Sequence, residues 1–211
     1  AAAAMRASTP ARAASISEVK LISSAQVLAS LARRLNRDAG APALPSLFFL
    51  TDPLRTPDPV ASARRLPVGA ALIYRHFGAA DRHRTARALA RVCRRRGLLL
   101  LIAADPELAA RVGADGVHWP ERLLPAACQG LATAAAHSLK AVQRARDAGA
   151  AVCLLSPVFA TASASARAPL GLSHASQIVR EASLPVIALG GVGQNNARRL
   201  IGRGFAGIGA V

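Results

Sequence analysis

The chain has 211 residues, 27 Lys and Arg against 11 Asp and Glu, and a composition that is 52% hydrophobic but only 3% aromatic. This length predicts one domain with a substantial core. The hydrophobic, aromatic-poor composition predicts that the core consists of Ala, Leu, Val and Ile, and it excludes a disordered chain. The net charge of +16 would suit a nucleic acid. However, the arginines fall mainly in helical segments and aromatic residues for base stacking are scarce, so we expect no nucleic-acid partner.

Cysteine usage and hydropathy bear on the compartment. Cys93, Cys128 and Cys153 are odd in number and widely spaced, without a CxxC pair. They provide no disulfide framework, which favours a reducing, cytoplasmic location. The longest apolar run, residues 97–104, is too short to cross a bilayer, so no membrane association is expected.

The first 45 residues differ from the rest of the chain. Residues 1–15 are rich in Ala, Arg and Ser and lack a signal peptide's apolar stretch. They predict a disordered tail, or residues foreign to the native protein. Apolar residues then recur at helical spacing from residue 16 to residue 36, and a Gly-Ala-Pro breaker follows at 40–42. Residues 16–45 therefore predict an N-terminal helix and linker.

From residue 46 to residue 211, short apolar strands alternate with helices. Strands are predicted at 47–50, 69–74, 98–103, 116–118, 131–135, 151–155, 185–189 and 206–211, and helices at 81–96, 106–112, 139–148, 173–182 and 195–203. Eight such strands predict an α/β fold, a (β/α)8 TIM barrel, with a doubly wound open sheet as the second architecture. Because the sequence ends at the eighth strand, no final outer helix is expected. The helix at 16–36 is the candidate to cover that gap.

In such a barrel the active site lies at the C-terminal ends of the strands. Arg75, Asp105, His118 and His137 all fall at predicted strand ends. Each histidine is as well explained by a structural role as by proton transfer. The glycine-rich turn from Leu189 to Asn196 leaves backbone N–H groups free to bind phosphate, although a tight turn before the next helix explains it equally well.

Several motifs, in order and at the right spacing, resemble the thiamine phosphate synthase/TenI family. They are LFFLTD (47–52), ADGVH (114–118), AHSL (136–139), SPVFAT (156–161), PLG (169–171) and PVIALGGV (185–192). The resemblance covers nearly the whole barrel and makes this a divergent member of the family. It implies a TIM barrel, and homodimers are common among such barrels.

The resemblance also implies a reaction, in which synthases join a pyrimidine pyrophosphate to a thiazole phosphate. Mg²⁺ held by two aspartates, together with two lysines, would stabilise the departing pyrophosphate. This sequence departs from that pattern at every one of these positions. Ala104 and Leu123 stand at the aspartate positions, Phe77 and Ala164 at the lysine positions, and Ala135 at a serine position. Asp105, one residue from Ala104, is the remaining candidate metal ligand.

The sequence retains the residues that the resemblance assigns to binding of the thiazole phosphate. The resemblance places phosphate at Gly190, Gly191, Thr161 and Ser163, and leaves His137, Arg75 and His118 as candidate catalytic residues. TenI-type members isomerise a thiazole carboxylate phosphate with a histidine in the motif that 137–139 matches. Three functions stay open: a synthase with a rearranged Mg²⁺ site, a metal-free tautomerase using His137, and a non-catalytic binder of a phosphorylated thiazole or pyrimidine ligand.

Overall fold

Eight parallel strands close into a barrel in their sequence order, because β8 pairs with β1. The computed structural model describes residues 16–41, 43–161 and 168–211, with side chains from residue 26 onwards. The strands are β1 Leu47–Leu50, β2 Ala71–Tyr74, β3 Leu99–Ala103, β4 Gly116–Trp119, β5 Leu131–Ala136, β6 Val152–Leu155, β7 Val186–Ala188 and β8 Gly207–Ala210. The predicted TIM barrel is confirmed, whereas the predicted tail at 1–15 lies outside the described residues.

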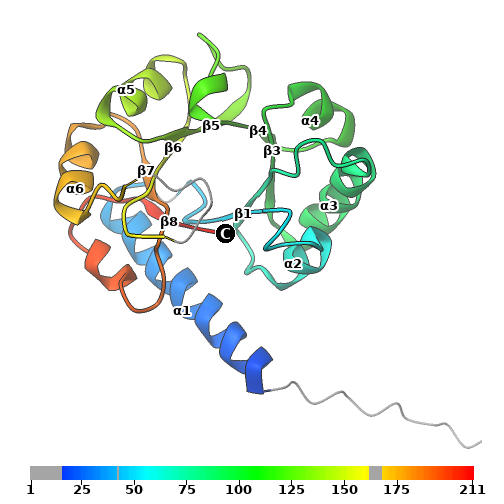
Figure 1. Cartoon of the computed structure of the whole chain (residues 1–211), viewed down its shortest axis with the longest axis horizontal. Helices are drawn as coiled ribbons and strands as arrows, with labels where there is room; N and C mark the ends of the chain where they lie inside the picture. The colour runs from blue at the N-terminus through cyan, green and yellow to red at the C-terminus, as the bar shows by residue number, and fades with distance from the viewer. Residues whose placement is uncertain (1–15, 42, 162–167) are drawn as a thin grey trace, which may run out of the picture.

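Outer helices surround the strands (Figure 1). They are α2 Pro59–Arg65, α3 Arg82–Arg96, α4 Pro106–Val112, α5 Leu139–Asp147 and α6 Leu172–Glu181. Local signals set their ends, as α4 illustrates. The Asp105 side chain accepts from the Leu108 amide, Pro106 takes the first turn, and Gly113 ends the helix in the left-handed conformation. The sequence analysis assigns no helix to 59–65, although Asp58 caps α2 in the same way.

One predicted helix is wrong, and one connection carries less helix than the barrel pattern implies. The segment predicted as a helix at 195–203 forms only the short 3-10 helix η2, Ala197–Leu200. The Asn196 side chain bonds back to the Gly191 carbonyl and the Gly193 amide, which holds the segment in a turn. Gly202 and Gly204 then adopt positive φ, which an α-helix does not allow. Between β4 and β5 the 3-10 helix η1, Glu121–Leu123, replaces an outer helix.

The N-terminal helix α1, Ile16–Asp38, belongs to the outer layer. It contacts β8, β1 and η2, and its buried residues Ala29, Ala32 and Leu35 join the core between strands and helices. The buried Asn36 side chain donates to the Ala206 carbonyl at 3.1 Å, just before β8. The prediction that this helix covers the gap beside the eighth strand is therefore confirmed. Figure 1 shows α1 running past the β8 side of the barrel.

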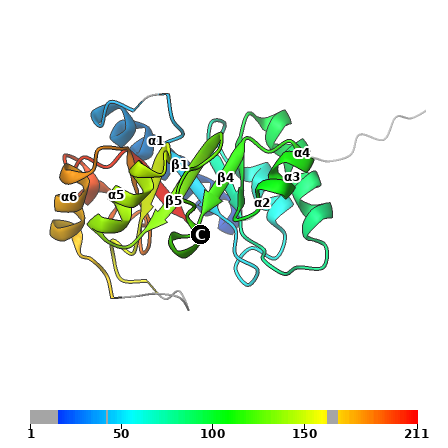
Figure 2. The ribbon, with the colours of Figure 1, turned by 90° about the horizontal axis from the view of Figure 1, so that it is seen from above.

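Two apolar layers fill the fold. Side chains that alternate along the strands pack inside the barrel, for example Ile73, Leu101 and Leu154, while their neighbours pack outward against the helices. Figure 2 shows the strands side-on, running toward the face that carries the C-terminus. The loops that follow the strands therefore gather at this face, the mouth of the barrel. Over the described residues, no helix is both long and apolar enough to span a membrane.

Candidate functional site

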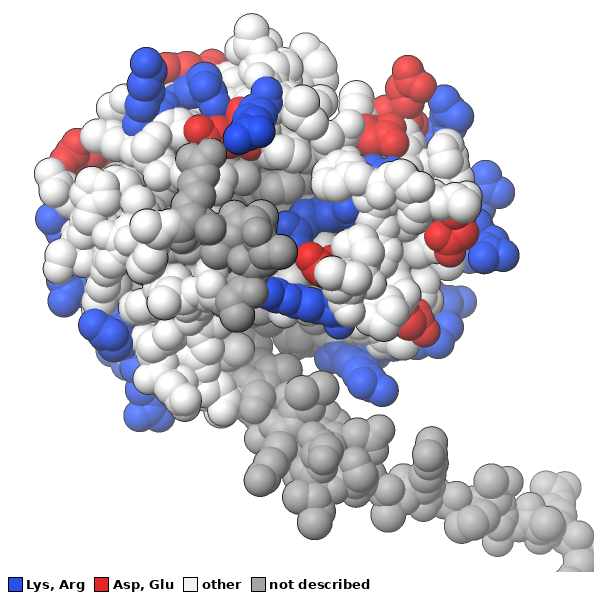
Figure 3. All heavy atoms as spheres, viewed as in Figure 1, with Lys and Arg blue, Asp and Glu red and all other residues white. Residues whose placement is uncertain are grey.

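A cavity of about 280 Å³ opens at the mouth, between the ends of β1, β2, β5, β6, β7 and β8. It brings together five predicted site residues, namely Arg75, His137, Thr161, Gly190 and Gly191. Ser163 lies outside the described residues. Figure 3 shows basic side chains, with acidic groups between them, around the hollow near the centre of this face. A larger cavity of about 400 Å³ lies at the opposite end, beside α1, and none of the predicted site residues lines it.

The turn after β7 offers backbone N–H groups to the cavity. The amides of Gly190, Gly191 and Val192 donate to no acceptor among the described residues. Gly190 and Gly191 have φ of 83° and 66°, the left-handed region that favours glycine. The Gly193 amide differs, because it donates to the Asn196 side chain at 2.9 Å. The turn can therefore hold a phosphate through three consecutive amides.

The same glycines are also required by packing. The Val158 and Phe159 amides donate to the Leu189 and Gly190 carbonyls, which joins the loop after β6 to the turn after β7. A Cβ at Gly190 would lie 2.7 Å from the Pro157 Cα, and a Cβ at Gly191 would collide with the Ala160 carbonyl. Both explanations given for the turn in the sequence analysis, phosphate binding and tight geometry, are compatible with this arrangement.

Arg75 extends from the end of β2 into the same cavity. Its backbone amide donates to the Thr51 hydroxyl at 3.0 Å and its Nε donates to the Thr51 carbonyl at 2.9 Å, which fixes the guanidinium. Asp52 lies 3.9 Å from Arg75 Nη2 and accepts from the amides of Leu54 and Arg55. Burial opposes the charged form of Asp52, but these hydrogen bonds and the nearby arginines outweigh it and lower the pKa of the carboxyl.

His137 and Glu121 form a short side-chain contact beside the mouth cavity. His137 follows β5, Glu121 begins η1 after β4, and their Nδ1 and Oε2 atoms are 2.6 Å apart. Arg144, on α5, donates to the Glu121 main-chain carbonyl at 2.8 Å and lies 3.9 Å from its carboxylate. His137 Nε2 has no hydrogen-bond partner among the described residues, so it stays available to a ligand. His137 is among the site residues predicted from the sequence, whereas Glu121, a carboxylate two residues after β4, is not.

His118 lies deeper in the barrel. It alternates with the outward-packed Val117, pairs in register with Thr133, and its Nδ1 is 2.9 Å from the Thr133 hydroxyl. The side chain is only 3% exposed and does not line the mouth cavity. Burial, with a smaller contribution from the Arg75 charge, lowers the pKa of His118 to about 3. The neutral imidazole therefore belongs to the barrel interior, where the Arg75 charge still acts on it, and it is not among the residues that line the mouth cavity.

Asp105 is also held away from the cavity. Ala104 turns the chain with a φ of 51°, and the Asp105 carboxylate caps α4 through the Leu108 amide at 2.9 Å. Its other oxygen is 3.6 Å from Arg82 Nε. Leu123 offers no ligand atom at the second metal position. No group of three or more His, Cys, Asp and Glu in the described chain is arranged to hold a metal ion. Asp105 is therefore engaged by α4 and Arg82 and does not line the mouth cavity.

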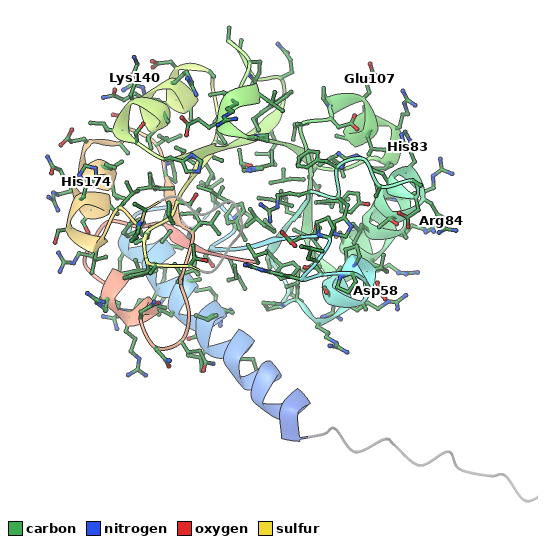
Figure 4. The ribbon with its side chains drawn as sticks, in the orientation of Figure 1. Asp58, His83, Arg84, Glu107, Lys140 and His174 are labelled. Atoms are coloured by element: carbon green, nitrogen blue, oxygen red, sulfur yellow. The ribbon has the colours of Figure 1, made fainter. Side chains whose placement is uncertain are left out.

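Two cysteines and two histidines lie away from the mouth cavity. Cys93 and Cys153 are buried, and burial raises the pKa of each thiol to about 12, so neither is a thiolate at neutral pH. His83 on α3 and His174 on α6 are exposed and point outward from the ring of helices (Figure 4). Among the described residues, His137 is therefore the one histidine that lines the mouth cavity.

Comparison with known proteins gives a consistent result. A family model described as thiamine monophosphate synthase matches residues 60–211. The thiamine-phosphate synthase of Alcanivorax borkumensis is 32% identical over 190 residues, covering 80% of this chain and 84% of that protein. The Bacillus velezensis enzyme of the same name is 28% identical over 190 residues, with 83% and 85% coverage. A solved thiamine phosphate pyrophosphorylase from Pyrococcus furiosus superposes with a TM-score of 0.67 at 28% identity, covering 78% and 84% of the two chains.

Proposed function

The chain belongs to the thiamine monophosphate synthase family, and on that premise we propose that it is a proton-transfer enzyme of thiamine metabolism. Its substrate would be a small phosphorylated thiazole, and its reaction a metal-independent isomerisation at His137. The carrying observation is the placement of His137 in one cavity with Arg75 and the glycine turn. A cytoplasmic location remains a prediction from cysteine usage.

Each part of the cavity has a role in this proposal. The phosphate of the ligand binds at the amides of Gly190, Gly191 and Val192, where a negative group meets three N–H donors. Arg75, fixed by Thr51, faces a second electron-rich part of the ligand. The ring that carries the reacting carbon then lies between these anchors, beside His137.

The proposed step moves one proton and leaves the composition of the ligand unchanged. His137 Nε2 accepts a proton from a ring carbon, and the C–H electron pair passes into the conjugated system of the ring. The imidazolium N–H exchanges with solvent and then delivers a proton to a different atom, which completes the isomerisation and introduces deuterium in D2O. Imidazole suits this exchange because one ring nitrogen can both accept and release a proton, and positioned bases of this kind contribute roughly 10²- to 10⁴-fold in rate.

The alternative is the synthase reaction after which the curated relatives are named. Sequence identity of 32% favours it, whereas the chemistry of the mouth argues against it. Asp105 is engaged by α4 and Arg82, and Leu123 replaces the second carboxylate. We therefore derive no step through Mg²⁺ for this chain.

The test is proton exchange between a thiazole carboxylate phosphate and D2O, followed by NMR with the full chain. We expect exchange by the wild type, a loss of at least about 100-fold in His137→Gln, and no change in His174→Gln, the matched outer histidine. Binding of the thiazole phosphate without exchange would support a non-catalytic binder instead. Formation of thiamine phosphate and pyrophosphate from thiazole phosphate and pyrimidine pyrophosphate in the presence of Mg²⁺ would support the synthase.

A further inference from the structure

We propose that Glu121 is a positioning residue for His137, which fixes the tautomer that presents a bare Nε2 to the cavity. This inference rests on the proposed function for its kinetic consequence, but its structural part can be measured separately. Glu121 lies in the WPERLLP segment, where the sequence departs from the family pattern. The feature that the proposed function does not yet use is the Glu121 carboxylate, which contacts His137.

The geometry defines which nitrogen carries the proton. A carboxylate can only accept, so the 2.6 Å contact requires a proton on His137 Nδ1. In the neutral ring, Nε2 is then the unprotonated nitrogen with a free electron pair. Neutral imidazole in water favours the opposite tautomer, with its proton on Nε2, which could not act as a base toward the cavity. The contact therefore selects the reactive form.

Glu121 is itself held in place from two directions. It begins η1, which contacts β5, so the backbone brings its carboxylate to the strand that precedes His137. Arg144 reaches from α5 to the Glu121 carbonyl at 2.8 Å and to the carboxylate at 3.9 Å. The side chains of Glu121 and His137 are 24% and 27% exposed, so their contact is partly shielded from water. This arrangement matches the way in which outer partners orient catalytic and metal-binding imidazoles.

A purely structural ion pair would have different consequences. It would fasten η1 to β5, and its loss would lower stability while leaving kcat close to its wild-type value. A positioning role predicts a change of tautomer, together with a fall in kcat at nearly constant KM. The two roles are therefore separated by whether a fall in kcat at nearly constant KM accompanies the change of tautomer.

The decisive variant is Glu121→Leu, because leucine neither donates nor accepts. In ¹⁵N NMR spectra of the labelled full chain, we expect wild-type His137 to carry its proton on Nδ1 and the variant to move toward the Nε2–H form. The exchange kcat should fall roughly 10- to 100-fold, with KM changed less than about twofold. Glu107→Leu is the matched control, an exposed glutamate on α4 that points away from the mouth (Figure 4).

A second pair of variants keeps the proposal testable if Glu121→Leu folds poorly. Arg144→Gln removes the contacts that hold Glu121 and should lower kcat by a smaller factor, about two- to fivefold. Lys140→Gln, on the same helix and exposed, should leave kcat unchanged. An unchanged His137 tautomer in Glu121→Leu, or in Arg144→Gln if that is the variant that folds, would overturn the inference. If His137→Gln retained full exchange, the proposed function would fail, while the tautomer measurement would still decide the role of Glu121.

Discussion

On the β3 side of the barrel mouth, the carboxylate that follows the strand is engaged by the fold. Asp105 caps α4 and faces Arg82, so both of its oxygens already have partners. On the β4–β5 side, no α-helix follows β4, and Glu121 points its carboxylate at His137 instead. A carboxylate at a strand end is thus available for chemistry where the following connection does not need it as a helix cap. In this chain the loss of a helix after β4 is what frees Glu121.

The largest expected effect concerns the glycine turn after β7, the third part of the mouth, which packing constrains and which we propose binds the phosphate. Gly191→Ala should lower the free energy of unfolding by about 3 kcal/mol or more, because the Cβ meets the Ala160 carbonyl and a non-glycine residue is strained at a φ of 66°. Urea unfolding measures this loss, and titration with inorganic phosphate should show weaker binding.

Gly193→Ala is the control for that turn. A Cβ at Gly193 has nothing within 4 Å, so its unfolding free energy should change by less than about 0.5 kcal/mol. Equal destabilisation by the two substitutions would mean that the contacts around Gly191 do not constrain the turn.

The next-largest expected effect distinguishes His118, which is buried in the barrel, from His137, which lines the mouth cavity. The pKa of His118 is about 3 in the folded chain, against about 6.5 when unfolded, so between these values the unfolded state binds more protons. His118 should therefore make stability fall with decreasing pH, by about 1.4 kcal/mol per pH unit from pH 6 to pH 4.

Urea unfolding at several pH values checks this dependence. His118→Gln keeps a group able to bond Thr133 but does not titrate, so its stability should fall less steeply with acid than that of the wild type. His83→Gln, which changes an exposed outer histidine, should reproduce the wild-type slope. Parallel profiles for His118→Gln and the wild type would contradict a buried neutral His118.

The smallest effect concerns Asp105. Asp105→Asn keeps the cap on α4, since asparagine caps as well as aspartate, but removes the ion pair with Arg82, so it should lower stability by no more than about 1 kcal/mol. Asp105→Ala removes the cap as well and should cost about 1 kcal/mol more. Neither variant should alter proton exchange. If Asp105→Asn abolished a Mg²⁺-dependent activity, Asp105 would be a metal ligand and the contrast between the two sides of the mouth would disappear.

Local patterns were enough to predict most of the fold. Buried parallel strands read as short apolar runs, and β1 and α4 have the predicted bounds because nearby turn and cap residues delimit them. The helix predicted at 195–203 fails because Asn196 bonds backward into the glycine turn, a contact that helix periodicity does not reveal. Helix α2 was missed although Asp58 and Pro59 form a start signal, because its seven residues show little periodicity.

The site was less predictable than the fold. The barrel pattern places Arg75, His137, Thr161 and the glycines at one mouth, where they line the same cavity, since parallel strands all end on the same face. The Glu121–His137 contact joins residues 16 apart and depends on how η1 turns after β4, which no local pattern gives. The capping role of Asp105 was readable, because Asp followed by Pro before an apolar run is a helix start.

The central claim is proton transfer at His137 without a metal. The most direct measurement is deuterium incorporation into a thiazole carboxylate phosphate by the wild-type chain, compared in EDTA and in excess Mg²⁺. We expect equal rates in the two conditions and loss of incorporation in His137→Gln. Turnover only in Mg²⁺, with thiamine phosphate formed from added pyrimidine pyrophosphate, would contradict it.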